Sequence, residues 1–131
     1  MNLLIDTHIF LWLLFEPEKI DKKHIRLLEA PENSLFMSDI SFWEISLKYS
    51  IGKLTLEGVT PDQLAPLSKN MGIRFLPLNT KPASSFHQLP RLKHKDPFDR
   101  MIIWQAIEGE YSLVSNDGSF AEYEQFGLTL V

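Results

Sequence analysis

The stretch NLLIDTHIFLWLLF, residues 2–15, joins two different elements of the predicted fold. NLLID (2–6) is typical of a buried strand, and HIFLWLLF (8–15) is typical of a helix that follows it. The stretch is apolar, but it has no basic segment before it and contains Asp6 and His8. We therefore interpret it as part of the core and not as a signal peptide.

The same alternation of strand and helix continues along the chain. Further strands are predicted at 34–38, 73–78, 112–115 and 128–131, and helices at 21–30, 40–51, 60–71, 81–87, 97–108 and 118–125. Ser38 or Asp39 can cap the helix at 40–51, which should end near Gly52. Apolar strands separated by helices predict an α/β fold with three layers, in which helices flank a central parallel sheet of about five strands.

The composition limits the kind of protein. A chain of 131 residues predicts a single domain spanning 1–131. No apolar run approaches the roughly 18 residues of a membrane span, so no membrane association is expected. The absence of cysteine excludes disulfides and thiolate metal sites and fits a cytoplasmic location. The net charge of -4 argues against a protein that coats nucleic acid non-specifically, but it allows a basic rim around an acidic pocket.

Two acidic residues interrupt the apolar pattern in the first half of the chain. Asp6 ends the first strand, where open α/β sheets bind ligands, although capping of the next helix by Asp6 or Thr7 explains it equally well. Glu44 lies on the predicted inward stripe of the helix at 40–51, with Ile40, Leu47, Ile51 and Leu54. A buried, unpaired carboxylate costs several kcal/mol, so Glu44 predicts a buried partner such as a cation. The alternative is a side chain at the edge of the face that reaches solvent.

KHKDPFDR (93–100) contains two more acids at the start of a predicted helix. Asp96 before Pro97 is typical of a helix cap. Asp99 could complete a capping box, but it shares a face with Ile102, Ile103 and Ala106, which should direct it toward the end of the first strand. Four nearby cations are candidate phosphate contacts or simply solvated side chains: Arg91, Lys93, Lys95 and Arg100. We interpret His94 as an ordinary loop histidine, with contact to a phosphate as the alternative.

Asp117, in LVSND (113–117), follows a strand that should be central, although it could equally cap a helix. Each acid alone is a weak signal. Together, Asp6, Glu44, Asp99 and Asp117 are predicted to converge, and converging carboxylates must take up protons or bind cations. Oxygen ligands without cysteine or a histidine cluster favour Mg²⁺ or Mn²⁺ over zinc.

Four blocks of the sequence resemble the signature blocks of PIN-domain proteins, and in particular VapC-type toxins of bacterial toxin–antitoxin pairs. They are LLIDTHIFLW (3–12), SFWEISLKYSIGKL (41–54), HKDPFDRMIIWQA (94–106) and LVSNDGSF (113–120). The resemblance implies a Mg²⁺- or Mn²⁺-dependent endoribonuclease, with Asp6, Glu44, Asp99 and Asp117 as catalytic and metal-binding acids. It also implies auxiliary roles for Asp96, which starts the helix, and for Ser115, which supports the last acid.

The partners follow from the same resemblance. It implies an RNA substrate, a homodimer and a small antitoxin whose C-terminal segment lies in an apolar groove and brings a basic side chain to the acids. Aromatic side chains of the helices at 8–15 and 40–51 could form that groove, although core packing explains most of them equally well: Phe10, Trp12, Phe15, Phe42, Trp43 and Tyr49.

Three other functions compete with this one. A receiver-type phosphoacceptor domain is disfavoured, because LLIDTH has a single acid and LVSND has no lysine. A non-catalytic binding scaffold with the same fold, and a nuclease that acts on other nucleic acid, both remain alternatives.

Overall fold

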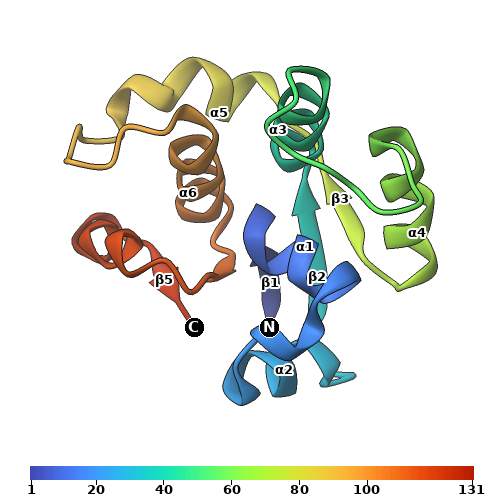
Figure 1. Ribbon diagram of the computed structural model, residues 1–131. Coiled ribbons are helices and arrows are strands. Elements are labelled where there is room, and N and C mark those ends of the chain that lie inside the picture. Colours follow the sequence, from blue (N-terminus) through green and yellow to red (C-terminus); the bar gives the residue numbers. More distant parts are fainter.

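Five parallel strands form the central sheet of the computed structural model, which describes residues 1–131 (Figure 1). The strand order is β3-β2-β1-β4-β5, with β1 (Asn2–Ile5) in the middle. The other strands are β2 (Ser34–Ser38), β3 (Arg74–Leu76), β4 (Ser112–Val114) and β5 (Thr129–Leu130). Leu3 lies opposite Leu35 of β2 and Ser112 of β4. The α/β fold with a parallel sheet of five strands confirms the predicted class.

Helical segments connect all the strands. The α-helices are α1 (Thr7–Phe15), α2 (Lys22–Glu29), α3 (Asp39–Ser50), α4 (Leu64–Asn70), α5 (Thr80–Ser85) and α6 (Pro97–Gly109). Short 3-10 segments are η1 (Pro17–Lys19), η2 (Pro61–Gln63), η3 (Phe86–Gln88) and η4 (Gly118–Phe126). None of the helices combines the length and the apolar character that a membrane crossing requires.

Three predicted elements differ in detail from the structure. The helix expected at 118–125 is the 3-10 segment η4, and the one expected at 60–71 is divided into η2 and α4. The strand expected at 73–78 is limited to β3, because Pro77 follows it and has no amide hydrogen to donate to a neighbouring strand.

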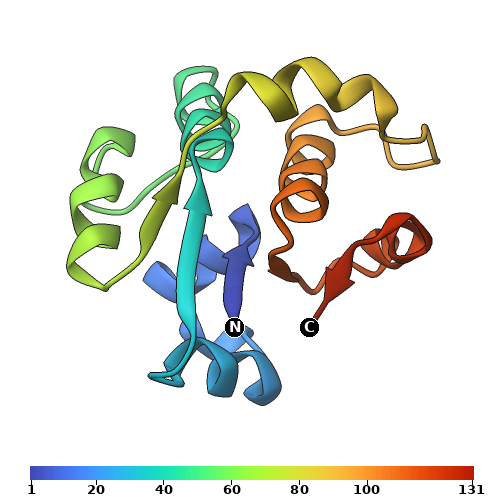
Figure 2. The same cartoon turned by 180° about the vertical axis from the view of Figure 1, so that it is seen from behind.

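The core has two parts, one on each face of the sheet. Successive side chains of a strand point to opposite faces, so Leu3 and Ile5 pack with α1 and α2, and Leu4 packs with α6 and η4. In Figure 2 the strands lie in front of α1, on whose side the first part is formed. β1 is therefore covered on both sides, and its carboxyl end, at Asp6, is held in a fixed place.

Helix α3 lies at the edge of the sheet and contributes to both parts of the core. Ile45 belongs to the part formed with α1, and Ile40 belongs to the part formed with α6. The strands β1 and β2 point toward α3 and α6, which lie side by side (Figures 1 and 2). The acids at the strand ends and at the start of α6 thus come to the same edge.

Candidate functional site

Asp6 lies at the carboxyl end of β1 and caps α1. Its Oδ1 accepts a hydrogen bond of 2.8 Å from the Ile9 amide, and the residue is only 4% exposed. Burial raises the pKa of Asp6 to about 6, although the Ser115 hydroxyl and the Ile9 amide offset part of the rise. The charge of Asp6 is therefore poorly stabilised by the protein alone.

Glu44 points inward from α3 and is 3% exposed, as its position on the sequence suggested. Thr7 Oγ1 donates a hydrogen bond of 2.7 Å to its Oε1, and Lys48 Nζ donates one of 2.5 Å to its Oε2. The partner of this buried carboxylate is therefore a lysine of the same helix. The alternative, a glutamate that reaches solvent, does not agree with its burial.

The predicted inward stripe of α3 is confirmed at Ile40, which is buried, but it is wrong toward the end of the helix. Leu47 and Ile51 are 38% and 56% exposed, whereas Ser41 and Ile45 are buried beside Glu44. The buried face is turned toward 41 and 45 because α3 packs against α6 and α1 at once and not on a single flat surface.

Asp96 and Asp99 occupy the start of α6. Asp96 is the N-cap, and its Oδ1 accepts a hydrogen bond of 3.0 Å from the Asp99 amide. Carboxylate oxygens of Glu44, Asp96 and Asp99 lie within 4.8 Å of one another. Burial raises the pKa of Asp99, and the charges of Asp96 and Glu44 raise it further, while His94 opposes them. Asp99 thus faces other carboxylates at the edge of the core.

His94 connects Asp99 to the segment that carries Asp117. Its Nε2 lies 2.8 Å from Asp99 Oδ2, and its Nδ1 lies 3.1 Å from Ser119 Oγ, which donates a hydrogen bond of 2.7 Å to Asp117 Oδ1. The ring also packs edge-on against Phe120. Our interpretation of His94 as an ordinary loop histidine missed these contacts. Its position two residues before the capping Asp96 was the only available signal.

Asp117 is the most exposed of the acids and caps η4. Its slight burial raises the pKa, but hydrogen bonds from the Ser119 hydroxyl and amide, together with His94, hold the pKa of Asp117 below its ordinary value. Ser115 Oγ accepts a hydrogen bond of 3.1 Å from the Asp117 amide, so this hydroxyl fixes the turn in which Asp117 lies.

The acids form two close groups that share Asp99. One contains Glu44, Asp96 and Asp99, and the other contains His94, Asp99 and Asp117. Asp6 belongs to neither group, but its carboxylate is close enough to Asp99 for that charge to raise its pKa. The carboxylate oxygens are donors that suit hard ions such as Mg²⁺ or Mn²⁺, whereas the imidazole is not a preferred ligand of these ions. The raised pKa values of Asp6 and Asp99 fit a bound cation.

The four cations near α6 differ in their surroundings. Arg91, Lys93 and Lys95 are exposed. Arg100 is partly buried: its Nη2 donates hydrogen bonds of 3.1 Å and 3.3 Å to the carbonyls of Leu89 and Pro90, and its guanidinium lies over the Phe86 ring. Arg100 therefore fixes the loop before α6, whereas the other three side chains are free to meet a ligand.

Two adjoining cavities lie beside α1, the smaller one against α3 and both against the segment after α3. One, of about 160 Å³, is lined by Thr7, His8, Leu11, Glu44, Ile45, Lys48, Lys53 and Leu54. The other, of about 430 Å³, is lined by His8, Leu11, Trp12, Phe15, Glu16, Leu54, Thr55, Leu56 and Glu57. Of the aromatic side chains expected in a groove, Trp12 and Phe15 line the larger cavity. Phe10 is fully buried in the core, and the aromatic side chains of α3 line neither cavity: Phe42, Trp43 and Tyr49.

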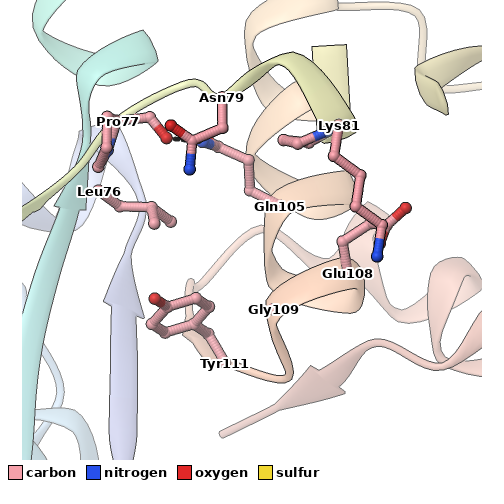
Figure 3. Close-up of a pocket in the computed structure, with 9 residues that line it drawn as sticks. Leu76, Pro77, Asn79, Lys81, Gln105, Glu108, Gly109 and Tyr111 are labelled. Atoms are coloured by element: carbon pink, nitrogen blue, oxygen red, sulfur yellow. Dashed lines mark hydrogen bonds and ion pairs between the residues drawn. The ribbon is translucent and has the colours of Figure 1, made fainter. Parts of the chain in front are cut away.

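A further pocket of about 270 Å³ lies between the end of β3 and α6 (Figure 3). Figure 3 shows Gln105 and Glu108 of α6, Tyr111 and Asn79 around it. Gln105 Oε1 accepts a hydrogen bond of 2.5 Å from Ser38 Oγ. None of the predicted site residues lines this pocket.

Comparison with known proteins gives a family and a set of similar structures. The profile of the PIN domain matches residues 3–125. VapBC2 from Rickettsia felis, bound to a DNA fragment from its promoter, contains a chain that is 16% identical, with a TM-score of 0.70 and coverage of 100% of this chain and 98% of that one. VapBC-1 from nontypeable Haemophilus influenzae gives 17% identity, a TM-score of 0.67 and coverage of 100% and 97%.

A third structure is VapBC-5 from Mycobacterium tuberculosis, a member of the VapBC family of toxin–antitoxin systems. It gives 16% identity, a TM-score of 0.61 and coverage of 99% of this chain and 97% of that one. At these identities the likeness concerns the fold. No curated protein matches the chain significantly in sequence.

Proposed function

The chain belongs to the PIN-domain family, and from this premise we propose that it is a Mg²⁺- or Mn²⁺-dependent endoribonuclease toxin that an antitoxin neutralises. The observation that carries the proposal is the position of Asp99. It lies within 4.8 Å of both Glu44 and Asp96 on one side and of Asp117 on the other, at the edge where β1 ends. Such a concentration of carboxylates is unfavourable in the absence of a cation.

In this proposal Asp6 and Asp99 bind the metal directly, and Glu44 and Asp117 complete the site. A bound divalent ion would polarise the phosphoryl oxygens and lower the pKa of a bound water for in-line attack. Asp96 has an auxiliary role, because it caps α6 and so fixes the direction of Asp99. His94 and Ser115 position Asp99 and the turn of Asp117 by hydrogen bonds.

The substrate would approach over the loop that precedes α6. Arg91, Lys93 and Lys95 are exposed there and can contact the phosphates on either side of the cleaved bond. Their charges would offset the negative field of the acids. Arg100 contributes by holding the carbonyls of Leu89 and Pro90, so that the three free cations stay near the site.

The antitoxin is proposed to bind in the cavities between α1 and the segment after α3. Trp12 and Phe15 line the larger cavity, and the smaller one reaches Glu44. An apolar segment in the first could therefore place a basic side chain near the acids through the second. The position of these two cavities supports the proposal independently of the similarity in fold to VapBC structures.

A homodimer is also proposed. Trp43, Leu47 and Ile51 repeat at intervals of four residues along the outer side of α3 and are all exposed, Trp43 by 60%. An exposed apolar stripe of this kind is typical of an interface between protein chains. The stripe lies beside the site, because Trp43 packs edge-on against Phe98 of α6.

The test is cleavage by the purified protein of single-stranded RNA, structured RNA and single-stranded DNA, with Mg²⁺, Mn²⁺ or EDTA. We expect RNA cleavage that needs metal and is lost in Asp6→Asn and Asp99→Asn. Glu32→Gln removes a charge from an exposed turn and is the matched control, with activity unchanged. Equal cleavage by all variants would refute the site. RNA binding without cleavage would favour a non-catalytic scaffold, and cleavage of DNA alone would change the substrate.

A further inference from the structure

Lys48 is the side chain that neutralises Glu44. Its Nζ lies 2.5 Å from Glu44 Oε2, one helical turn away on α3. Glu44 is almost fully buried, whereas the side chain of Lys48 is 35% exposed. The other oxygen of Glu44 accepts from Thr7. A buried carboxylate that lost this ammonium would have no other cation in contact with it.

The charge of Lys48 also acts on the two acids that form a close group with Glu44. Asp96 and Asp99, whose oxygens lie within 4.8 Å of those of Glu44, both attract the ammonium. A divalent cation that entered this group would meet a positive charge already bound to one of its acids. Two cations a few Å apart repel, so the ion and Lys48 compete for Glu44.

The structure leaves Lys48 room to move. The side chain lines the cavity of about 160 Å³, together with Lys53 and Leu54, and its outer part reaches solvent. Lysine has a flexible four-carbon stem, so its ammonium can leave Glu44 while the stem keeps its packing. The ammonium also lies over the Phe98 ring, whose centre is 5.9 Å from Nζ.

We propose that Lys48 is the internal counter-cation of the group formed by Glu44, Asp96 and Asp99. Its ammonium binds Glu44 in the metal-free protein and is displaced when a divalent ion binds. Because this ion pair must break first, Lys48 weakens metal binding. Lys48 is a positioning residue in this role, since it acts on the metal through Glu44. The inference rests on the proposed metal-dependent function. It assigns to the chain a means of burying Glu44 with a partner before the ion arrives.

The experiment compares Mn²⁺ binding by calorimetry in wild type, Lys48→Met and Lys48→Arg. Lys48→Met keeps the apolar stem and removes the charge, so we expect binding that is roughly three- to tenfold tighter, the size of a partly screened charge interaction. Lys48→Arg keeps the charge and should bind within about twofold of wild type. Lys53→Met is the matched control, because Lys53 lines the same cavity but forms no ion pair, and it too should stay within about twofold.

Thermal unfolding provides a second readout, in which the gain in stability from added Mn²⁺ separates the proposed role from a purely structural one. Lys48→Met should unfold at a lower temperature than wild type in EDTA, because Glu44 loses its partner, but gain more from added Mn²⁺. If Lys48→Met does not fold, Lys48→Gln can be used, since its amide can still donate to Glu44 without a charge.

The outcomes separate this inference from the function on which it rests. If Asp99→Asn binds Mn²⁺ as tightly as wild type, the proposed metal site is wrong. If Asp99→Asn loses binding but the uncharged Lys48 variants bind with the affinity of wild type, or more weakly, the metal site stands and the counter-cation role is wrong. Equal tightening in Lys53→Met would also refute it, because the effect would then follow from net charge and not from the contact with Glu44.

Discussion

Replacement of Asp6 by asparagine should stabilise the metal-free protein at neutral pH. Asp6 is 4% exposed, and burial raises its pKa from 3.8 to about 6. At about 1.4 kcal/mol per pKa unit, ionisation of Asp6 in the folded protein costs roughly 3 kcal/mol more than in the unfolded chain. Asparagine carries no charge, and its side-chain oxygen can still accept the hydrogen bond from Ile9 that caps α1.

The effect should depend on pH in a defined direction. Because the pKa of Asp6 is higher in the folded protein, the folded state binds more protons between pH 3.8 and about 6. The contribution of Asp6 to stability is therefore favourable at low pH and is lost as the pH rises through this window. Asp6→Asn should be more stable than wild type by up to about 3 kcal/mol near pH 7.5, and most of this difference should disappear near pH 4.

The assay is urea unfolding in EDTA at both pH values, followed by circular dichroism. Apart from His8 and Asp99, whose charges interact with that of Asp6, the other groups titrate alike in both proteins, so the difference between the proteins reports chiefly on Asp6. The exposed control Glu32→Gln should change the free energy of unfolding by no more than about 0.5 kcal/mol at either pH. A gain of the same size at both pH values, or a loss of stability at neutral pH, would refute burial as the dominant influence on Asp6.

Two further predictions concern α6 and the loop before it. Asp96→Asn can still cap α6 and should keep much more RNA-cleaving activity than Asp99→Asn in the same assay; equal loss would make Asp96 itself a residue of the reaction. Arg100→Met should lower the free energy of unfolding measured in urea by about 1–3 kcal/mol, since two loop carbonyls lose a charged donor. Lys95→Met should change the free energy of unfolding by no more than about 0.5 kcal/mol but weaken RNA binding. The opposite pattern would contradict the structural role of Arg100.

The fold class could be predicted because the strands of a parallel sheet are buried on both faces. LLI (3–5) and LFM (35–37) are continuous apolar runs for this reason, and the helices between the strands follow from ordinary capping signals such as Ser38 before α3. The orientation of α3 could not be predicted in the same way. Helical spacing shows which residues share a face, but the surfaces against which the helix packs decide which face is buried. Leu47 is exposed because the buried face of α3 lies at Ser41 and Ile45 instead.

The positions of the acids were accessible from the sequence for a similar reason. Parallel strands end at the same edge, so an acid after β1 and an acid after β4 are expected at the same edge of the sheet. The ion pair of Glu44 and Lys48 was accessible as well, because residues four apart on a helix are neighbours. The contacts of His94 were not accessible, because they depend on where the loop before α6 is placed.

Three of the acids at this edge also hold helices in place. Asp6 caps α1, Asp96 caps α6 and Asp117 caps η4, each by accepting a hydrogen bond from a backbone amide. A helix cap requires an oxygen acceptor but not a charge, and asparagine satisfies it, whereas a hard metal ion requires the charge. The same side chains can thus both determine where the helices begin and hold a cation. Asparagine variants separate these two roles, because they remove the charge that the cation needs and keep the oxygen that caps the helix.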